Sequence, residues 1–273
     1  MDDEVLRYYE RTSEAQRLSG GSGLLEFARI QEIVMRHLPP PPARVLDVGG
    51  GPGVHAEWLL ERGYDVYLLD PVEKHLAQAS RLPLAGIAKG DARELPCEDA
   101  SADAVLLLGP LYHLPDREQR LAALREARRA LKPRGVLFAS AISRWASLLH
   151  GLLDGFLDDP AFTALLDRDL ATGQHENPTG EPRYFTSSVL HRPEELREEL
   201  HTAGFGSVDL LPVEGPGWLA RDLEERWKDA ERRSRILHLV RQVENEPALL
   251  GCSLHLLAIG RCYAASDSSS GSA

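Results

Sequence analysis

The sequence has few cysteines, no long apolar run and fewer basic than acidic residues. Its three cysteines are odd in number and lack the spacing of a metal site, which predicts reduced thiols in a cytoplasmic protein. The longest apolar run, from Ala104 to Leu108, is far shorter than the roughly 20 residues of a membrane-spanning helix. The first residues, Met1 to Glu4, are acidic, which argues against a signal or transit peptide.

The charge of the chain restricts its partners. The sequence has 31 Lys and Arg against 42 Asp and Glu, for a net charge of −11. Such a chain repels polyanions, so neither nucleic acids nor anionic membrane surfaces are expected as partners. Hydrophobic residues make up 43% of the chain, which is enough for a packed core and excludes global disorder. A homodimer is left open.

Strand-like and helix-like segments alternate along most of the chain. Strands are predicted at 44–48, 65–70, 84–89, 102–108, 136–141, 207–213 and 253–261. The intervening helices are predicted at 54–62, after Pro71, after Asp116 and at 194–202. This alternation requires crossover connections and is typical of an α/β fold with a doubly wound, mostly parallel sheet, here of about seven strands.

Helical lids are expected to flank this sheet and to interrupt its second half. Residues 1–38 form an expected N-terminal helical lid, which ends at four consecutive prolines. The α/β domain is expected at 39–263, with lid insertions at about 144–185 and 214–250. The helices predicted in these lids are 24–38, 145–157, 161–170 and 219–244, and a loop is predicted at 172–183. The tail 264–273 is small and polar, and is predicted to be disordered.

A glycine-rich turn follows the first strand. Its sequence is Asp47-Val-Gly49-Gly-Gly51-Pro-Gly53. The glycines let the backbone turn sharply and approach a ligand, and the next helix presents free N–H groups. Residues 51–56 also fit the nicotinamide dinucleotide pattern G-x-G-x-x-A. Asp47 argues against that class, because a carboxylate at the strand end repels a pyrophosphate and attracts a ligand with an ammonium and a sulfonium. A plain turn with a surface aspartate is the competing interpretation.

The turn and two later aspartates resemble the class I S-adenosylmethionine-dependent methyltransferases. Asp70 ends the second strand, 70 − 47 = 23 residues after Asp47, where the family places an acidic residue for the ribose hydroxyls. Asp91-Ala92 follows the third strand, where the family binds the adenine amino group. The resemblance implies a Rossmann-like fold that binds S-adenosylmethionine and releases S-adenosylhomocysteine. It implies cofactor contacts at Asp47, Gly49, Gly51, Gly53, Asp70, Pro71, Asp91, Ala92 and Gly109, and at Arg17 and Tyr9 of the N-terminal lid.

The three aspartates are expected to converge on one ligand. Taken singly, Asp70 and Asp91 also fit the role of a helix cap. The carboxyl ends of neighbouring parallel strands line one crevice, however, so Asp47, Asp70 and Asp91 are expected to meet there. In the family, an N-terminal helix often closes this crevice, so Arg17 would bind the cofactor carboxylate and Tyr9 would cover its methionine arm. A solvated helix face is the alternative for both residues.

The segment after the fourth strand carries the candidate catalytic residues. It reads Gly109-Pro-Leu-Tyr112-His113, whereas family members that methylate nucleobase or glutamine amides have Asn or Asp, Pro, Pro and Tyr there. The missing amide acceptor argues against a DNA or protein amide methylase. His113, with Tyr112 beside it, is predicted to face the transferred methyl, where a neutral imidazole takes a proton from a hydroxyl or amine. A histidine packed under the lid is the competing interpretation.

The lid after the fifth strand supplies the candidate substrate contacts, His175, Tyr184 and His191, with ordinary loop residues as the alternative. His175 and Glu176 are adjacent without further ligands at a suitable spacing, so no metal site is predicted. The expected function is transfer of a methyl group to an O, N or C nucleophile of a small molecule, for example a natural-product intermediate. A nicotinamide-dependent oxidoreductase and a non-catalytic cofactor-binding protein remain as alternatives.

Overall fold

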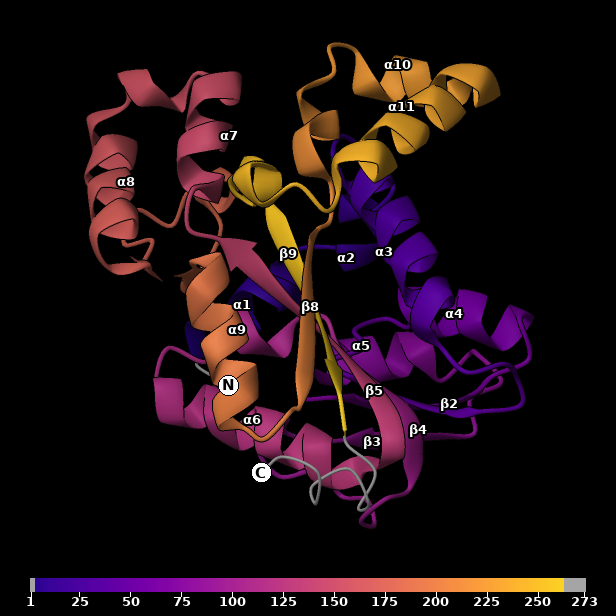
Figure 1. The fold of residues 1–273 in the computed structure, drawn as a ribbon. Helices are drawn as coiled ribbons and strands as arrows, with labels where there is room; N and C mark the ends of the chain where they lie inside the picture. The colour runs from indigo at the N-terminus through magenta and orange to yellow at the C-terminus, as the bar shows by residue number, and fades with distance from the viewer. Residues whose placement is uncertain (1–2, 263–273) are drawn as a thin grey trace, which may run out of the picture.

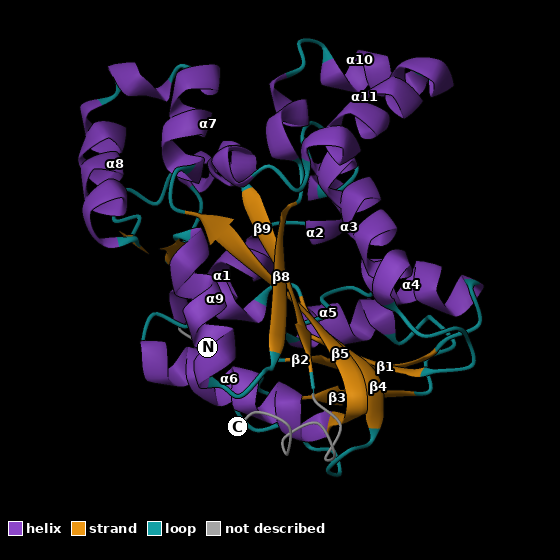
Figure 2. Cartoon of the chain, viewed as in Figure 1, coloured by secondary structure: helices purple, strands orange, loops and turns teal. Residues whose placement is uncertain are grey.

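A computed structural model describes residues 3–262 of the chain. Within this range the strands form one mixed sheet at the centre of the molecule, and helices surround it (Figures 1 and 2). The tail 264–273, predicted to be disordered, lies outside the described residues. No helix of the described part combines the length and the apolar character needed to cross a membrane.

The first five strands run parallel in the order β3-β2-β1-β4-β5. They are β1 (Arg44–Val48), β2 (Asp65–Asp70), β3 (Gly86–Lys89), β4 (Ala102–Leu107) and β5 (Leu131–Ser143). The helices between them are α4 (Val54–Glu61), α5 (Glu73–Ala79) and α6 (Arg117–Ala130), with a short 3-10 helix at Pro110–His113. Asp116 caps α6, because its side chain accepts from the backbone N–H of Glu118 at 2.7 Å.

Two strands from the C-terminal part extend the sheet beyond β5. β9 (His255–Arg261) lies antiparallel to β5, and β8 (Ser207–Pro212) lies antiparallel to β9. β8 therefore runs in the direction of the parallel strands. The start of β9 and the end of β8 both lie at the edge of the sheet where the parallel strands end. The mostly parallel α/β sheet predicted from the sequence is confirmed.

Helices cover both faces of the sheet, as a doubly wound fold requires. One face buries apolar side chains of α6 and of α9 (Pro193–Thr202), including Leu124 and Leu200. The other face buries α3 (Gly23–His37) and α4, including Ile33 and Leu59. The N-terminal segment 1–38, expected as a lid, therefore contributes α3 to the core of the sheet, while α1 (Asp3–Arg11) and α2 (Glu14–Arg17) precede it.

Two secondary-structure predictions in the second half are wrong. The segment predicted as a loop contains β6 (Gln174–His175), which pairs with an unpredicted strand, β7 (Ser188–His191). β7 pairs in turn with the end of β5, which extends two residues beyond its predicted end at 141. These strands are too short to show an alternating pattern, and their pairing depends on the protruding end of β5.

The predicted single helix 219–244 is also wrong, because it is divided into two. A 3-10 helix at Gly215–Leu219 precedes α10 (Leu223–Lys228) and α11 (Ala230–Val243). Asp229 separates these helices, and its side chain caps α11 by accepting from the N–H groups of Glu231 and Arg232.

Both lid insertions lie above the carboxyl edge of the sheet. In Figure 1, α10 and α11 are at the upper right, and α7 (Ala146–Asp154) and α8 (Pro160–Thr172) are at the upper left. The remaining short 3-10 helices are Phe156–Asp158, Pro182–Tyr184 and Pro247–Cys252.

Candidate functional site

A cavity lies at the carboxyl ends of β1, β2 and β4, which we call the cofactor cavity. The candidate cofactor residues that line it are Tyr9, Arg17, Asp47, Gly49, Gly51, Asp70, Pro71, Asp91, Ala92 and Gly109. Tyr112 and His113 line the same cavity. Gly53 is not among the lining residues. It begins α4 with a φ of +91°, and a Cβ there would lie 2.6 Å from Leu82 Cδ1, so its place in the motif is explained by the turn.

Asp47 is the most unusual group in the cofactor cavity. Its side chain is buried, and its Oδ2 atom has no hydrogen-bond partner. Burial, together with the negative charge of Asp70, raises the pKa of Asp47 to about 7. A buried carboxylate oxygen without a donor is costly, so the site fits a ligand that brings a cation or an N–H group to this atom. The ammonium group of S-adenosylmethionine meets that requirement.

The glycine turn brings backbone close to the cavity. Gly49 has a φ of +70°, and a Cβ there would lie 2.7 Å from Pro110 Cγ. At Gly50 a Cβ would lie 2.6 Å from Asp47 Oδ2. Gly51 has a φ of +58° and no atom closer than 3.9 Å to a Cβ, so a side chain there enters open space. The turn therefore leaves bare backbone for a ligand.

Asp70 ties the end of β2 to the glycine turn. Its Oδ2 accepts from the Gly51 N–H at 2.8 Å, and its Oδ1 accepts from the Val72 N–H at 2.8 Å. His75 Nδ1 lies 3.2 Å from the same Oδ1. These bonds fix the carboxylate on the cavity wall. Asp91 is more exposed, and the hydrogen bond and charge of Arg93 hold its pKa below the ordinary value, although partial burial opposes this.

His113 lies under the N-terminal helix α1. The Tyr9 hydroxyl is 2.8 Å from His113 Nε2, and His113 Nδ1 is 3.3 Å from the backbone oxygen of Ser187. The carbonyl requires the proton on Nδ1, so Nε2 accepts from Tyr9. Burial lowers the pKa of His113 to about 4, which keeps the ring neutral. The Tyr112 ring packs against it with centroids 4.7 Å apart.

Arg17 forms a two-pronged ion pair with Glu26. Its Nη1 is 2.5 Å from Glu26 Oε2, and its Nη2 is 2.8 Å from Glu26 Oε1. Arg17, Glu26, Tyr9 and Tyr112 line both the cofactor cavity and a second cavity, which we call the acceptor cavity. The two cavities therefore share a wall.

The acceptor cavity has a volume of about 360 Å³ and an aromatic lining. Its aromatic wall residues are Tyr8, Tyr9, Tyr112, Phe156, Phe162, Tyr184 and Phe185. Two of the candidate substrate residues, His175 and Tyr184, line it. Both ring nitrogens of His175 are engaged, one with Asp169 Oδ2 at 2.8 Å and one with the Tyr184 carbonyl at 2.7 Å.

His191, the third candidate substrate residue, lies outside the residues that line the two cavities. It is buried on β7, and its Nε2 is 3.4 Å from Glu199 of α9. The structure therefore places most of the residues singled out in the sequence on the two cavities, with Gly53 and His191 as the exceptions.

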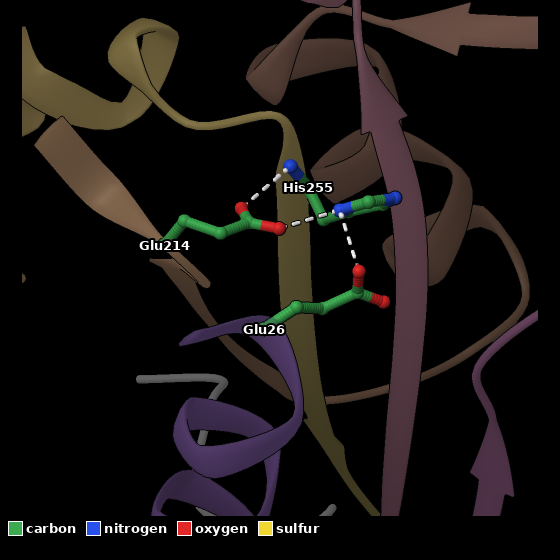
Figure 3. Close-up of side chains that lie close together, drawn as sticks. All are labelled: Glu26, Glu214 and His255. Atoms are coloured by element: carbon green, nitrogen blue, oxygen red, sulfur yellow. Dashed lines mark hydrogen bonds and ion pairs between the residues drawn. The ribbon is translucent and has the colours of Figure 1, made fainter. Parts of the chain in front are cut away.

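Sequence reasoning missed a buried charged cluster on the wall of the acceptor cavity. Figure 3 shows Glu26 of α3, Glu214 just after β8 and His255 at the start of β9 side by side. His255 Nδ1 lies 2.7 Å from Glu214 Oε1 and 3.7 Å from Glu26 Oε2. The available signal is an ionisable residue directly after one apolar strand and another at the start of the following apolar strand. The start of β9 lies at the carboxyl edge of the parallel strands because β9 runs antiparallel to them.

Comparison with known proteins identifies the family. The methyltransferase domain family matches residues 46–139. An uncharacterized methyltransferase of Mycobacterium tuberculosis is 39% identical over 101 residues, which is 37% of this chain and 40% of that protein. The chain thus matches only about two fifths of the length of this relative. The ubiquinone/menaquinone biosynthesis C-methyltransferase of Acidiphilium cryptum is 34% identical over 198 residues, or 68% of this chain and 75% of that protein.

Solved structures share the fold. A methyltransferase from Thermotoga maritima superposes with a TM-score of 0.58 at 17% identity, covering 96% of this chain and 99% of that one. One from Mesorhizobium loti gives a TM-score of 0.57 at 20% identity, covering 87% of this chain and 99% of that one. Three observations support the same family. They are the matching sequence motifs, the cavity with the unpaired Asp47 oxygen, and the long alignments. The chain belongs to the family of class I S-adenosylmethionine-dependent methyltransferases, and S-adenosylmethionine is its cofactor.

Proposed function

We propose that this chain transfers the methyl group of S-adenosylmethionine to an O, N or C nucleophile of a small molecule. The observation that carries the proposal is the wall shared by the cofactor cavity and the acceptor cavity. Because Tyr9, Arg17, Glu26 and Tyr112 line both cavities, the cavities adjoin, and a ligand in each would lie next to the other at these residues. This arrangement allows direct transfer while the lids exclude water.

The residues of the cofactor cavity bind and orient. S-adenosylmethionine supplies, when bound, an activated methyl group on a positively charged sulfur. Asp47 offers an unpaired carboxylate oxygen for a cationic group, and Asp70 offers a carboxylate held in place by two backbone N–H groups. Most of the acceleration in such a displacement comes from holding the reactants in line at contact distance.

His113 has a supporting role in this proposal. Its Nε2 is an acceptor that Tyr9 now occupies, and an acceptor hydroxyl or amine that replaces the Tyr9 hydroxyl transfers its proton there. The low pKa that burial gives this imidazole makes it a weak base. Orientation of the nucleophile is therefore its larger contribution.

The acceptor is proposed to be a planar aromatic small molecule, a class that includes natural-product intermediates. The aromatic lining of the acceptor cavity supports this, because ring stacking and apolar burial favour a flat ligand. Two relatives are named for quinone biosynthesis, which fits a flat ring as acceptor. They are the ubiquinone/menaquinone biosynthesis C-methyltransferase of Acidiphilium cryptum and a ubiquinone biosynthesis O-methyltransferase of Xanthomonas campestris. The second is 37% identical over 120 residues, or 41% of this chain and 48% of that protein.

Methyl-labelled S-adenosylmethionine tests the proposal. The protein is incubated with the labelled cofactor and a fractionated extract of small molecules, and products are identified by mass and label. We expect one labelled product and an equal amount of S-adenosylhomocysteine. Binding of S-adenosylhomocysteine without labelling of any fraction would favour a non-catalytic binding protein. Binding of nicotinamide dinucleotides in its place would favour the oxidoreductase.

A further inference from the structure

Beyond the position of Glu26 between the two cavities, the charged cluster on the acceptor-cavity wall has no part in the function proposed above. Its members come from three distant segments: Glu26 from α3, Glu214 from the end of β8 and His255 from the start of β9 (Figure 3). Glu26 and His255 line the acceptor cavity. Buried charges are costly unless they are paired, so a cluster of this kind requires an explanation.

Glu214 fixes the His255 ring in one orientation. The Glu214 side chain is fully buried, and its Oε1 lies 2.7 Å from His255 Nδ1. Its Oε2 accepts from the backbone N–H of His255 at 3.0 Å and from Ser253 Oγ at 2.7 Å. These three contacts hold the Glu214 carboxylate in place. The carboxylate in turn restricts rotation of the His255 ring through Nδ1. His255 is therefore positioned before any ligand arrives.

The charges of the cluster balance when His255 is protonated. Arg17 contributes one positive charge to the two carboxylates of Glu26 and Glu214, which leaves one charge to be supplied. Burial lowers the pKa of His255, but the negative charges of Glu26 and Glu214 outweigh this and raise it to about 9. Burial likewise opposes ionisation of Glu26, and the charges of Arg17 and His255 nevertheless lower its pKa to about 2.

The other ring nitrogen of His255 faces away from the carboxylates. In Figure 3, this second nitrogen points to the opposite side of the ring from Glu214 and Glu26. The side chain is 17% exposed and lines the acceptor cavity. Among residues 3–262, no hydrogen-bond acceptor is assigned to Nε2, whereas Nδ1 is engaged. When the ring is protonated, Nε2 therefore carries an N–H donor that neither carboxylate uses.

We propose that His255 Nε2–H binds an anionic oxygen, a carboxylate or phenolate, of the methyl acceptor. This inference rests on the proposed function, because it specifies the substrate class of the same site. The His255 N–H donor is charged and prepositioned, which suits an anionic oxygen. The surrounding wall is largely aromatic, which suits a flat ring that carries this oxygen. The cavity would then select anionic aromatic acceptors over neutral ones of the same shape.

A divalent metal is the competing occupant of the cluster. Ligand atoms of Glu26, Glu214 and His255 lie within 4.8 Å of one another. Arg17, however, already binds both oxygens of Glu26, and the proton on Nδ1 is shared with Glu214. A metal would have to displace both, which favours the imidazolium.

Benzoate and its neutral analogue benzamide test the inference. Their dissociation constants are measured by NMR titration of the protein saturated with S-adenosylhomocysteine at neutral pH. We expect wild type to prefer benzoate by at least about tenfold, as a charge-assisted hydrogen bond provides. His255→Asn should abolish the preference. Its amide nitrogen replaces Nδ1 as a donor to Glu214, and nothing replaces Nε2.

His150→Gln is the matched control. His150 lines the same cavity, but its Nδ1 lies 3.2 Å from Asp154 on its own helix. The preference for benzoate should persist in this variant. Equal binding of the two probes by wild type, no benzoate binding, or a preference that survives in His255→Asn would each overturn the inference.

Three further measurements separate the inference from a folding defect, from a metal site and from the proposed function. If His255→Asn does not fold, Glu214→Gln replaces it in the benzoate and benzamide titrations. Independently of any variant, NMR of isotope-labelled histidine should show both His255 ring nitrogens protonated in wild type. Tight binding of Zn²⁺ or Mn²⁺ that is lost in His255→Asn would contradict the inference. If wild type did not bind S-adenosylhomocysteine, the proposed function would be overturned instead, since that measurement does not involve His255.

Discussion

The two cavities are built in different ways. The cofactor cavity uses neighbouring positions in sequence: Asp47, Gly49 and Gly51 fall within one turn, and Asp70 ends the next strand. The charged cluster of the acceptor cavity unites Glu26 with His255, which are 255 − 26 = 229 residues apart. The centre of the proposed cofactor site is therefore a local property of the sequence, whereas the charged cluster of the proposed acceptor site depends on how the whole sheet is assembled.

The largest expected effect is in the glycine turn. Gly51→Val places a β-branched side chain at a φ of +58° and directs it into the open space of the cofactor cavity. We expect calorimetry to detect no binding of S-adenosylhomocysteine. Gly180→Val is the matched control, because Gly180 has a φ of +69° with nothing within 4 Å and lies outside both cavities. It should lose stability but keep cofactor affinity. Equal affinities in the two variants would contradict the placement of the cofactor.

Asp47→Asn should weaken binding and stabilise the free protein. Loss of a charged hydrogen bond reduces affinity for S-adenosylhomocysteine by about 1.5–3 kcal/mol, or roughly tenfold to a hundredfold. The pKa of Asp47, raised by burial from 3.8 to about 7, means that the folded state retains a proton that the unfolded state has lost. Stability of wild type therefore falls as pH rises through this window, by up to about 4 kcal/mol.

Chemical denaturation at several pH values measures this effect. The difference in unfolding free energy between Asp47→Asn and wild type should grow from about pH 4 to about pH 7. If the difference in unfolding free energy did not change with pH, the pKa of Asp47 would not be raised in the free protein.

The unfolding free energy should also fall with rising pH because of His255, but at higher pH than for Asp47. The pKa of His255 is raised from 6.5 to about 9 by Glu26 and Glu214, despite burial. The stability it contributes is fully present below pH 6.5 and is lost as pH rises through about 9, by up to about 3 kcal/mol. His255→Asn should remove this loss from the denaturation data. A variant with the same slope as wild type would show that the ring is neutral.

The smallest effect is expected at His113. His113→Gln removes a weakly basic imidazole and should slow product formation about tenfold while S-adenosylhomocysteine affinity stays unchanged. Single-turnover assays with labelled cofactor measure the rate. An unchanged rate would assign His113 to packing beneath α1.

The same contrast explains what could be predicted from the sequence. The strands 44–48 and 65–70 are predictable to the residue, because their apolar runs end at glycine and aspartate. β7 is not predictable from its own four residues, because they form a strand by pairing with β6 and with the end of β5. His255 was missed because its place beside Glu26 follows from the reversed direction of β9, which no local pattern records.

The structure of the complex with S-adenosylhomocysteine tests the central claim most directly. We predict that the ligand lies in the cofactor cavity, with its amino group within hydrogen-bonding distance of Asp47 Oδ2. Its sulfur should face the wall shared with the acceptor cavity at Tyr9 and Tyr112. A ligand bound elsewhere, or one whose sulfur faces away from that wall, would contradict the account.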